Sequence, residues 1–448
     1  MIINQKLVQK NVKIDMKRLL YKNLLDWKKN PNRKPLILNG ARQVGKTWLL
    51  QNFGFQEYES VAYINCESAT NINELFADFD TKRIIRALSA YTNVDIVPND
   101  SLIILDEVQQ NPRILTALKY FCEEAPQYHI AVAGSLLGIA LHQGISYPVG
   151  KVDELNLYPM NFDEFLMALD KKQAYDALHS GDWSLINSLS NVFIELLRQY
   201  YYVGGMPAVV KAYIDGLGLQ EIRNLQKQIL RDYTRDFSKH TQNREVTRIN
   251  LVWDQIPQQL AKENKKFFYS NLKPGGRAKD YEIAIQWLLD SGLIYKVNRV
   301  SQIRKPLRFY EEPLVFKLFT LDVGLLGAQM DTAASDVLIS NNGFVEYKGA
   351  FSEQFFLTQL LPIGIPIRYF SSNTSRVEID FVIQTEQEVI PVEVKAEQNV
   401  YSKSLITLLG KRPDLHALRF SLLPHSIQRQ IENVPLYAVS AFFEQYKK

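Results

Sequence analysis

The chain has 448 residues, of which 46% are hydrophobic and 22% charged, and its formal net charge is +4 at pH 7. This length exceeds one ordinary hydrophobic core and predicts roughly two to four domains of a soluble globular protein. No apolar run approaches the ~20 residues of a membrane span, and the first residues lack the pattern of a signal peptide. Two cysteines, Cys66 and Cys122, give neither a disulfide framework nor a zinc site. We expect a cytoplasmic protein without a membrane partner.

The positive charge is concentrated in the middle of the chain. Residues 221–310 contain 18 Lys and Arg against 9 Asp and Glu, a net charge of +9, so the remainder carries 4 − 9 = −5. A local basic surplus of this kind indicates a face that contacts nucleic acid.

Residues 40–47 read Gly-Ala-Arg-Gln-Val-Gly-Lys-Thr and follow the apolar run at 35–38. This spacing is typical of a phosphate-binding loop, in which backbone N–H groups and the start of the next helix face the phosphates. Lys46 is expected to reach the β- and γ-phosphates of a nucleotide, and the Thr47 hydroxyl to hold Mg²⁺. The residues predicted to contact the nucleotide are Gly40, Gln43, Val44, Gly45, Lys46, Thr47 and Trp48.

A second apolar run, at 101–105, ends in Asp106 and Glu107. Carboxylates at the end of a buried parallel strand suit a magnesium ion and an attacking water. We expect Asp106 to support the metal and Glu107 to deprotonate the water. Lys46 is also expected to be a catalytic residue.

Two further strands are predicted at 61–66 and 129–135, and the second ends at Ser135. Ser135 is a candidate catalytic residue that holds the attacking water. It equally suits the cap of a helix that starts at Leu136, and both interpretations stay open.

Segments 40–47, 102–109 and 131–138 resemble the Walker A, Walker B and sensor-1 regions of AAA+ ATPases. Segments 148–151, 157–165 and 202–207 are similar to one branch of them, prokaryotic ATPases whose C-terminal domain has no assigned function. The resemblance implies ATP as the nucleotide, Mg²⁺-dependent hydrolysis and ATP sites at subunit interfaces, hence a homo-oligomer. No arginine acting from a neighbouring subunit is identified, Arg113 being only a position after the second strand. Lys151 stands where this branch usually has Arg, and we expect it to be solvated surface because Lys lacks the bidentate fork.

The basic middle begins with a predicted helix over 218–240. Its basic residues recur every four positions and predict a stripe that is either a solvated face or a nucleic-acid contact: Arg223, Lys227, Arg231, Arg235 and Lys239. Helices around 251–260 and 279–289, followed by a strand from 292–297 and further basic residues, are typical of a winged helix. Such modules bind DNA or serve as protein adaptors, and duplex DNA is the partner that we expect here.

The C-terminal third contains a predicted hairpin with strands at 377–383 and 389–395 and a turn at 384–388. Because side chains alternate along a strand, Asp380, Glu393 and Lys395 are expected on the same face, opposite their apolar neighbours. Upstream, Glu353 lies in a helix-like run at 351–357.

A helix Glu, a strand Asp and a Glu-x-Lys resemble the PD-(D/E)XK nuclease superfamily, with Ile379 in place of the Pro. The resemblance implies a nuclease-like site of Glu353, Asp380, Glu393 and Lys395, in which two carboxylates bind a second Mg²⁺ near a scissile phosphate while Lys395 positions or activates water. The alternative is a nuclease-like fold that has lost activity, in which the carboxylates form ion pairs with Lys395.

Together these motifs predict a multidomain α/β protein. The expected domains are a P-loop AAA+ ATPase core at 1–160, a helical lid at 161–215, a basic winged-helix module at 216–332 and a nuclease-like α/β domain at 333–448. The leading hypothesis is a Mg²⁺-dependent ATPase that couples nucleotide state to a DNA-directed, nuclease-like C-terminal domain. The alternative is an ATP-dependent signalling or scaffold switch whose nuclease-like domain is inactive and binds a protein partner.

Overall fold

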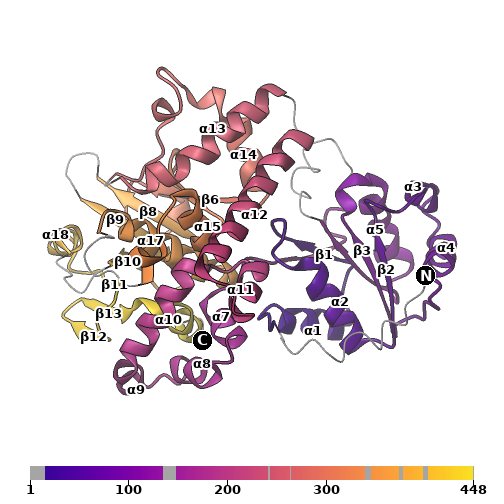
Figure 1. Cartoon of the computed structure of the whole chain (residues 1–448), viewed down its shortest axis with the longest axis horizontal. Helices are drawn as coiled ribbons and strands as arrows, with labels where there is room; N and C mark the ends of the chain where they lie inside the picture. Colours follow the sequence, from indigo (N-terminus) through magenta and orange to yellow (C-terminus); the bar gives the residue numbers. More distant parts are fainter. Residues whose placement is uncertain are drawn as a thin grey trace. The chain divides into compact units, whose positions relative to one another are not determined.

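The computed structural model describes residues 16–134, 148–240, 243–262, 264–338, 345–372, 377–396 and 402–446. The chain forms two compact units (Figure 1). The N-terminal unit contains residues 17–158 and 290–293, and the C-terminal unit contains Met16, residues 159–289 and residues from 294 onward. In the described residues no helix is both long enough and apolar enough to span a membrane.

In the described part of the N-terminal unit, five strands form a parallel sheet in the order β2-β3-β4-β1-β5. The strands are β1 (Leu36–Asn39), β2 (Ser60–Asn65), β3 (Ser101–Asp106), β4 (His129–Ala133) and β5 (Asp153–Asn156). The helices are α1 (Tyr21–Lys29), α2 (Lys46–Glu57), α3 (Ile72–Leu75), α4 (Thr81–Thr92) and α5 (Pro112–Glu124), with a 3₁₀ turn η3 (Val108–Gln110). This parallel sheet confirms the α/β core that the sequence predicts.

Alternation along the strands explains why helices cover both faces of this sheet. Ile103 and Leu105 of β3 face a core shared with α4 and α5, to which Leu88 and Phe121 contribute. Leu102, which points the other way, packs near Gly54 of α2. Every residue of β3 and β4 is buried, as expected of central parallel strands. Figure 1 shows α1 and α2 on one side of the sheet and α4 and α5 on the other.

The C-terminal unit begins with helices. They are α7 (Phe162–Ala168), α8 (Lys172–Leu178), α9 (Trp183–Ser188), α10 (Ser190–Val203), α11 (Pro207–Ile214), α12 (Leu219–His240), α13 (Asn243–Leu260) and α14 (Glu282–Asp290), with 3₁₀ turns η4 (Tyr269–Asn271) and η5 (Ala278–Asp280). α7 starts with a capping box, because the Asn161 side chain accepts from the Glu164 N–H while Glu164 accepts from the Asn161 N–H.

A mixed sheet completes the C-terminal unit. In the described residues it has eight strands in the order β12-β13-β11-β10-β9-β8-β6-β7. The strands are β6 (Ile294–Val300), β7 (Glu311–Thr320), β8 (Ile367–Ser371), β9 (Glu378–Gln384), β10 (Val389–Val394), β11 (Ala417–Ser421), β12 (Ser426–Gln428) and β13 (Ile431–Pro435). The helices among them are α15 (Val323–Gln329), α16 (Ala334–Leu338), α17 (Val345–Leu360), α18 (Lys403–Lys411) and α19 (Val439–Tyr446), with 3₁₀ turns η6 (Leu307–Tyr310), η7 (Leu361–Ile363) and η8 (Leu436–Ala438).

The strand expected at 292–297 in the winged helix corresponds to β6, which pairs with β7 and is part of this sheet. β6 pairs with β8 in parallel through Arg299 and Val300. The second half of β7, from Phe316 to Thr320, is buried, so its apolar side chains belong to the core of the C-terminal unit. The sheet therefore includes strands on both sides of residue 332, where the sequence analysis divided the chain.

The Gly-Gly pair of segment 202–207 is a close-packed junction. Gly204 has φ +76°, and a Cβ on it would lie 2.3 Å from Asp322 Oδ1. A Cβ on Gly205 would lie 2.0 Å from the Met160 carbonyl oxygen. The Gly205 N–H donates to Asp322 Oδ2 at 2.6 Å, and the Met160 N–H donates to the Gly205 carbonyl at 2.7 Å. Side chains are absent here because the Asp322 side chain and the Met160 backbone occupy their space.

Candidate functional site

The loop that joins β1 to α2 has the conformation of a phosphate-binding loop. Gly40, Gln43 and Gly45 all have positive φ, at 149°, 67° and 95°. A Cβ on Gly40 would lie 2.3 Å from the Leu157 carbonyl oxygen, so only glycine fits there. Gly45 is the left-handed residue directly before α2, which begins at Lys46. The turn therefore places the free N–H groups at the start of α2 beside the loop.

Lys46 is held at the base of this loop. Its side chain is 7% exposed, and its Nζ donates to the carbonyl oxygens of Gly40 and Ala41, each at 2.8 Å. Burial lowers the pKa of Lys46 to about 8, although the charges of Glu107 and Asp106 act in the opposite direction. The ammonium group is therefore positioned within the loop that is predicted to surround the phosphates.

Thr47 and Asp106 meet although 59 residues separate them in the sequence. The Thr47 hydroxyl donates to Asp106 Oδ2 at 2.6 Å. Burial raises the pKa of Asp106, and the Thr47 hydrogen bond opposes that shift. A hydroxyl and a carboxylate on adjoining elements are the oxygen ligands that Mg²⁺ prefers, so these residues fit the implied magnesium ion.

Glu107 follows directly with a left-handed backbone, φ +53°. Its N–H donates to Asp106 Oδ1 at 3.0 Å, and the Gln109 Nε2 donates to Glu107 Oε2 at 2.7 Å. The turn thus separates two adjacent carboxylates, one towards Thr47 and one towards Gln109. Glu107 therefore lies directly beside the Thr47–Asp106 pair.

Two residues of this site have no role in the sequence analysis. One is Gln109, which lies within the Walker B segment. The other is Tyr63, whose hydroxyl donates to Asp106 Oδ2 at 3.3 Å. Burial and the charge of Asp106 raise the pKa of Tyr63 to about 12, so it stays a proton donor. The signal in the sequence is that Tyr63, whose ring carries a hydroxyl, lies between buried Ala62 and Ile64 on β2, the strand next to β3.

The remaining nucleotide-contact candidates lie around the loop in different ways. Val44 is fully buried, and its carbonyl accepts from Arg18 Nη1 at 2.8 Å. Trp48 is 39% exposed at the start of α2. Ser135 lies outside the described residues.

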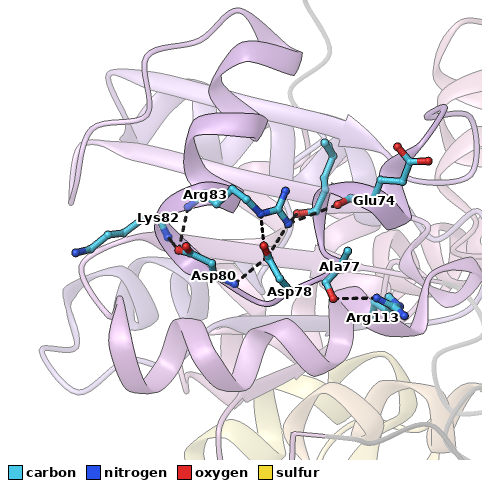
Figure 2. A network of polar contacts seen from close by, with 8 residues as sticks. Glu74, Ala77, Asp78, Asp80, Lys82, Arg83 and Arg113 are labelled. Carbon is cyan, nitrogen blue, oxygen red and sulfur yellow. Dashed lines mark hydrogen bonds and ion pairs between the residues drawn. The ribbon is translucent and has the colours of Figure 1, made fainter.

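Arg113 and Lys151 have local partners. Figure 2 shows Arg113 near the segment between α3 and α4, where its Nη1 donates to the Ala77 carbonyl at 3.0 Å. In the same network Arg83 binds Asp78 at 2.6 Å, while Asp80 caps α4 (Figure 2). Lys151 forms an exposed ion pair with Glu123 at 2.9 Å, which agrees with the expected surface position.

A second set of candidates gathers on the C-terminal sheet. β9 and β10 are antiparallel, and Val392 pairs with Phe381, so Glu393 is next to Asp380 in register. Asp380 Oδ2 accepts from the Val394 N–H at 2.9 Å, and Lys395 Nζ lies 2.6 Å from Glu393 Oε1. Burial, with the charges of Glu353 and Glu393, raises the pKa of Asp380 to about 7, while nearby lysines oppose the shift. The structure thus brings Glu353, Asp380, Glu393 and Lys395 together.

Two lysines that the sequence analysis did not single out enter this cluster. Lys317 of β7 is completely buried, and its Nζ lies 3.6 Å from Glu353 Oε2 and 2.9 Å from Glu378 Oε1. Lys265 forms an ion pair with Glu353 Oε1. Burial lowers the pKa of Lys317, but the surrounding carboxylates outweigh it and the net shift is upward. The available signal was a lone Lys between Phe316 and Leu318 in an apolar strand.

These contacts do not fit the second Mg²⁺ that the nuclease resemblance implies. Both oxygens of Glu353 face ammonium groups. Throughout the described residues, no three His, Cys, Asp or Glu side chains are arranged to hold a metal ion.

The basic stripe predicted on α12 is not continuous. Arg223 is 5% exposed and donates to the Gln226 side chain at 2.7 Å and the Gly324 carbonyl at 3.1 Å. Lys227 pairs with Asp331 at 2.5 Å. Arg223 was thus wrongly assigned to a surface stripe, because its guanidinium group binds the buried start of α15. Arg231 and Arg235 are exposed, and the side chain of Lys239 is outside the described residues.

Comparison with protein families gives a match for the region that contains the loop at 40–47 and Asp106. Residues 32–166 match the family described as AAA domain. The N-terminal unit therefore contains an AAA-type P-loop domain. Residues 194–336 and 348–439 match two domains of unknown function, DUF8612 and DUF4143, so neither match bears on a winged helix or a nuclease.

Among curated proteins there is no match. Similar solved structures include the Walker-type ATPase PABY2304 of Pyrococcus abyssi, at 14% identity and TM-score 0.45, covering 69% of this chain and 94% of that one. They also include the Aeropyrum pernix ORC2 protein in its ADP form, at 14% identity and TM-score 0.29, covering 72% and 92%. Likeness at these scores is too weak to carry a functional argument.

Proposed function

We propose that the N-terminal unit binds ATP with Mg²⁺ and hydrolyses it. The observation that carries this proposal is the hydrogen bond between Thr47 and Asp106, with Lys46 buried in the loop on one side and Glu107 on the other. The AAA-domain match over these residues supports the same activity.

Each residue then has a distinct task. Lys46 offers positive charge to the terminal phosphates, and the N–H groups at the start of α2 bind phosphate oxygens. Thr47 and Asp106 would hold Mg²⁺, which neutralises charge on the phosphates when it is bound. Glu107 accepts a proton from the attacking water, and Gln109 orients the Glu107 carboxylate.

Two substitutions test this assignment. Glu107→Gln should lower ATP turnover at least about 100-fold while ATP still binds, because the amide cannot accept the proton. Lys46→Ala should lower turnover by a similar factor and also weaken binding. Turnover is measured as phosphate release and binding by calorimetry with Mg-ATP. Glu124→Gln and Lys119→Ala, on the exposed side of α5, serve as controls and should change neither. Normal phosphate release in Glu107→Gln would refute its role as the base.

We further infer that ATP binding and hydrolysis control contact between the C-terminal unit and duplex DNA. The support is the charge exposed by the described part of residues 221–310. Its exposed basic side chains are Arg231, Arg235, Lys262, Lys273, Arg277, Lys279, Arg304 and Arg308, against exposed Glu221, Asp254 and Glu282. This surplus remains after the buried Arg223 is removed from the predicted stripe. The nuclease-like order of Glu353, Asp380, Glu393 and Lys395 supports the same nucleic-acid-directed role.

A salt titration distinguishes DNA from a protein partner. Affinity for labelled duplex DNA should fall about a hundredfold or more between about 50 and 200 mM salt, because phosphate contacts release counterions. Replacing Arg231 and Arg235 with Ala should reduce the salt slope by about one per lost contact. The control replaces exposed Lys171 and Lys172, outside the basic segment, with Ala. Binding is compared between Glu107→Gln with ATP and the natural chain with ADP. Absence of salt-dependent binding would favour the switch that binds a protein.

A further inference from the structure

We propose that the ammonium groups of Lys265 and Lys317 take the place of a divalent cation in the carboxylate cluster of the C-terminal unit. The inference deepens the proposed role of that unit, because it makes the cluster a buried, metal-independent ion-pair network rather than a cutting site. It does not depend on ATP hydrolysis by the N-terminal unit.

The first argument is geometric. Glu353 is buried, and each of its carboxylate oxygens faces a different lysine, Oε1 facing Lys265 and Oε2 facing Lys317 at 3.6 Å. Lys317 also lies 2.9 Å from Glu378 Oε1 and therefore joins α17 to β9. In this arrangement the helix carboxylate, one of the three candidate metal ligands, already has two cations beside it.

The second argument is the charge of the cluster. In the described residues it contains four carboxylates, Glu353, Glu378, Asp380 and Glu393, and three ammonium groups, Lys265, Lys317 and Lys395. The formal charge is thus −4 + 3 = −1 with every group ionised. A divalent ion added to this set would lie beside ammonium groups of the same sign, and their repulsion opposes its binding in a buried site. The lysines supply the neutralisation that a metal would otherwise provide.

The third argument concerns whether a metal could displace the lysines. Lys317 lies within a strand and is completely buried, with its Nζ 4.8 Å from the centre of the Tyr369 ring. Its ammonium group cannot turn into solvent without opening the sheet. Lys265 lies on the segment after α13, and its side chain is 13% exposed. Lys317 is therefore the fixed counter-cation and Lys265 the replaceable one.

The test measures Mn²⁺ bound by the full chain without nucleotide, from the electron paramagnetic resonance signal of the free ion. Every sample carries Asp106→Asn to weaken the predicted metal site of the N-terminal unit. This background and its Asp380→Asn derivative should bind equal amounts of Mn²⁺. Adding Lys317→Met should create one further site per chain, and Glu393→Gln should then remove it.

Two results would overturn the proposal. One is a Mn²⁺ ion that the Asp106→Asn chain binds with both lysines in place and that Asp380→Asn removes. This result would overturn the proposal even if no lysine variant folds. The other is a folded lysine variant, with unchanged circular dichroism, that gains no ion. Lys265→Met, on the more exposed segment, provides the second variant should Lys317→Met fail to fold. Plasmid incubated with Mn²⁺ should show no cleavage that depends on Asp380. ATP turnover is measured separately, on chains that keep Asp106, and tests only the proposed ATPase.

Discussion

At the nucleotide site, single residues act by fixing the orientation of the Asp106 carboxylate. Asp106 receives hydrogen bonds from Thr47, from the Glu107 N–H and from Tyr63, so neither of its oxygens rotates freely. Groups in this position commonly tune metal affinity without touching the metal. Tyr63 is the contributor that can be changed with the least disturbance, because Phe keeps the ring.

We predict that Tyr63→Phe raises the Mg²⁺ concentration for half-maximal ATP turnover by about tenfold, with a smaller change at saturating Mg²⁺. The reason is that Asp106 loses one of the donors that hold its Oδ2. Mg²⁺ titrations of the initial rate measure the effect. Tyr91→Phe, on the exposed side of α4, is the matched control and should behave as the natural chain. An unchanged Mg²⁺ dependence in Tyr63→Phe would show that its hydroxyl plays no part in positioning Asp106.

At the scale of elements, the Gly204–Gly205 turn joins segments distant in sequence. It connects α10 to α11, while Asp322 caps α15 through the Leu325 N–H and also accepts from the Gly205 N–H. The Tyr200 hydroxyl donates to the Met160 carbonyl at 2.6 Å, on the same side of the turn. The turn thus contacts Met160 just before α7, the end of α10 and the start of α15.

We predict that Gly205→Ala destabilises the C-terminal unit by about 3 kcal/mol, because the added Cβ would lie 2.0 Å from the Met160 carbonyl oxygen and the backbone must move. Urea unfolding measures the loss. Gly410→Ala in α18 is the matched control, since no atom lies within 4 Å of its added Cβ, and Ala favours a helix. Equal stability of the two variants would contradict the proposed packing.

At the scale of the whole molecule, residues far apart in sequence meet within each unit. In the C-terminal unit His179, at the end of α8, lies 3.3 Å from Asp163 of α7 and 3.4 Å from Glu444 of α19. Burial lowers the pKa of His179, but the two carboxylates outweigh it and raise the pKa to about 9. The imidazolium therefore joins α7 to α19.

We predict that this contact stabilises the unit below about pH 6.5 and is lost as the pH rises towards 9. The sign follows because the folded state holds the proton more tightly than the unfolded state. The difference in free energy of unfolding between the natural chain and His179→Gln should shrink by about 2 kcal/mol across that interval. Urea unfolding at several pH values measures it. Asp163→Asn should reduce the slope, and a difference that stays constant with pH would refute the prediction.

The sequence alone determined the features that depend on short spacing. The loop at 40–47, the strand ending in Asp106 and Glu107, and the alternation that puts Asp380 beside Glu393 each involve about ten neighbouring residues, whose geometry follows from helix and strand periods. These features specified the parallel P-loop core, which the structure confirms, and the nuclease-like candidates, which it brings together.

Only the tertiary structure decided which distant groups lie beside these motifs. Tyr63 next to Asp106, the buried Arg223, and Lys265 and Lys317 on Glu353 depend on strand order and on segments separated by tens of residues. The same strand order put β6 and β7 into the C-terminal sheet. Periodicity shows which face a side chain takes, whereas its partner across that face is chosen by the packing of the whole unit, where burial makes an unpaired charge costly.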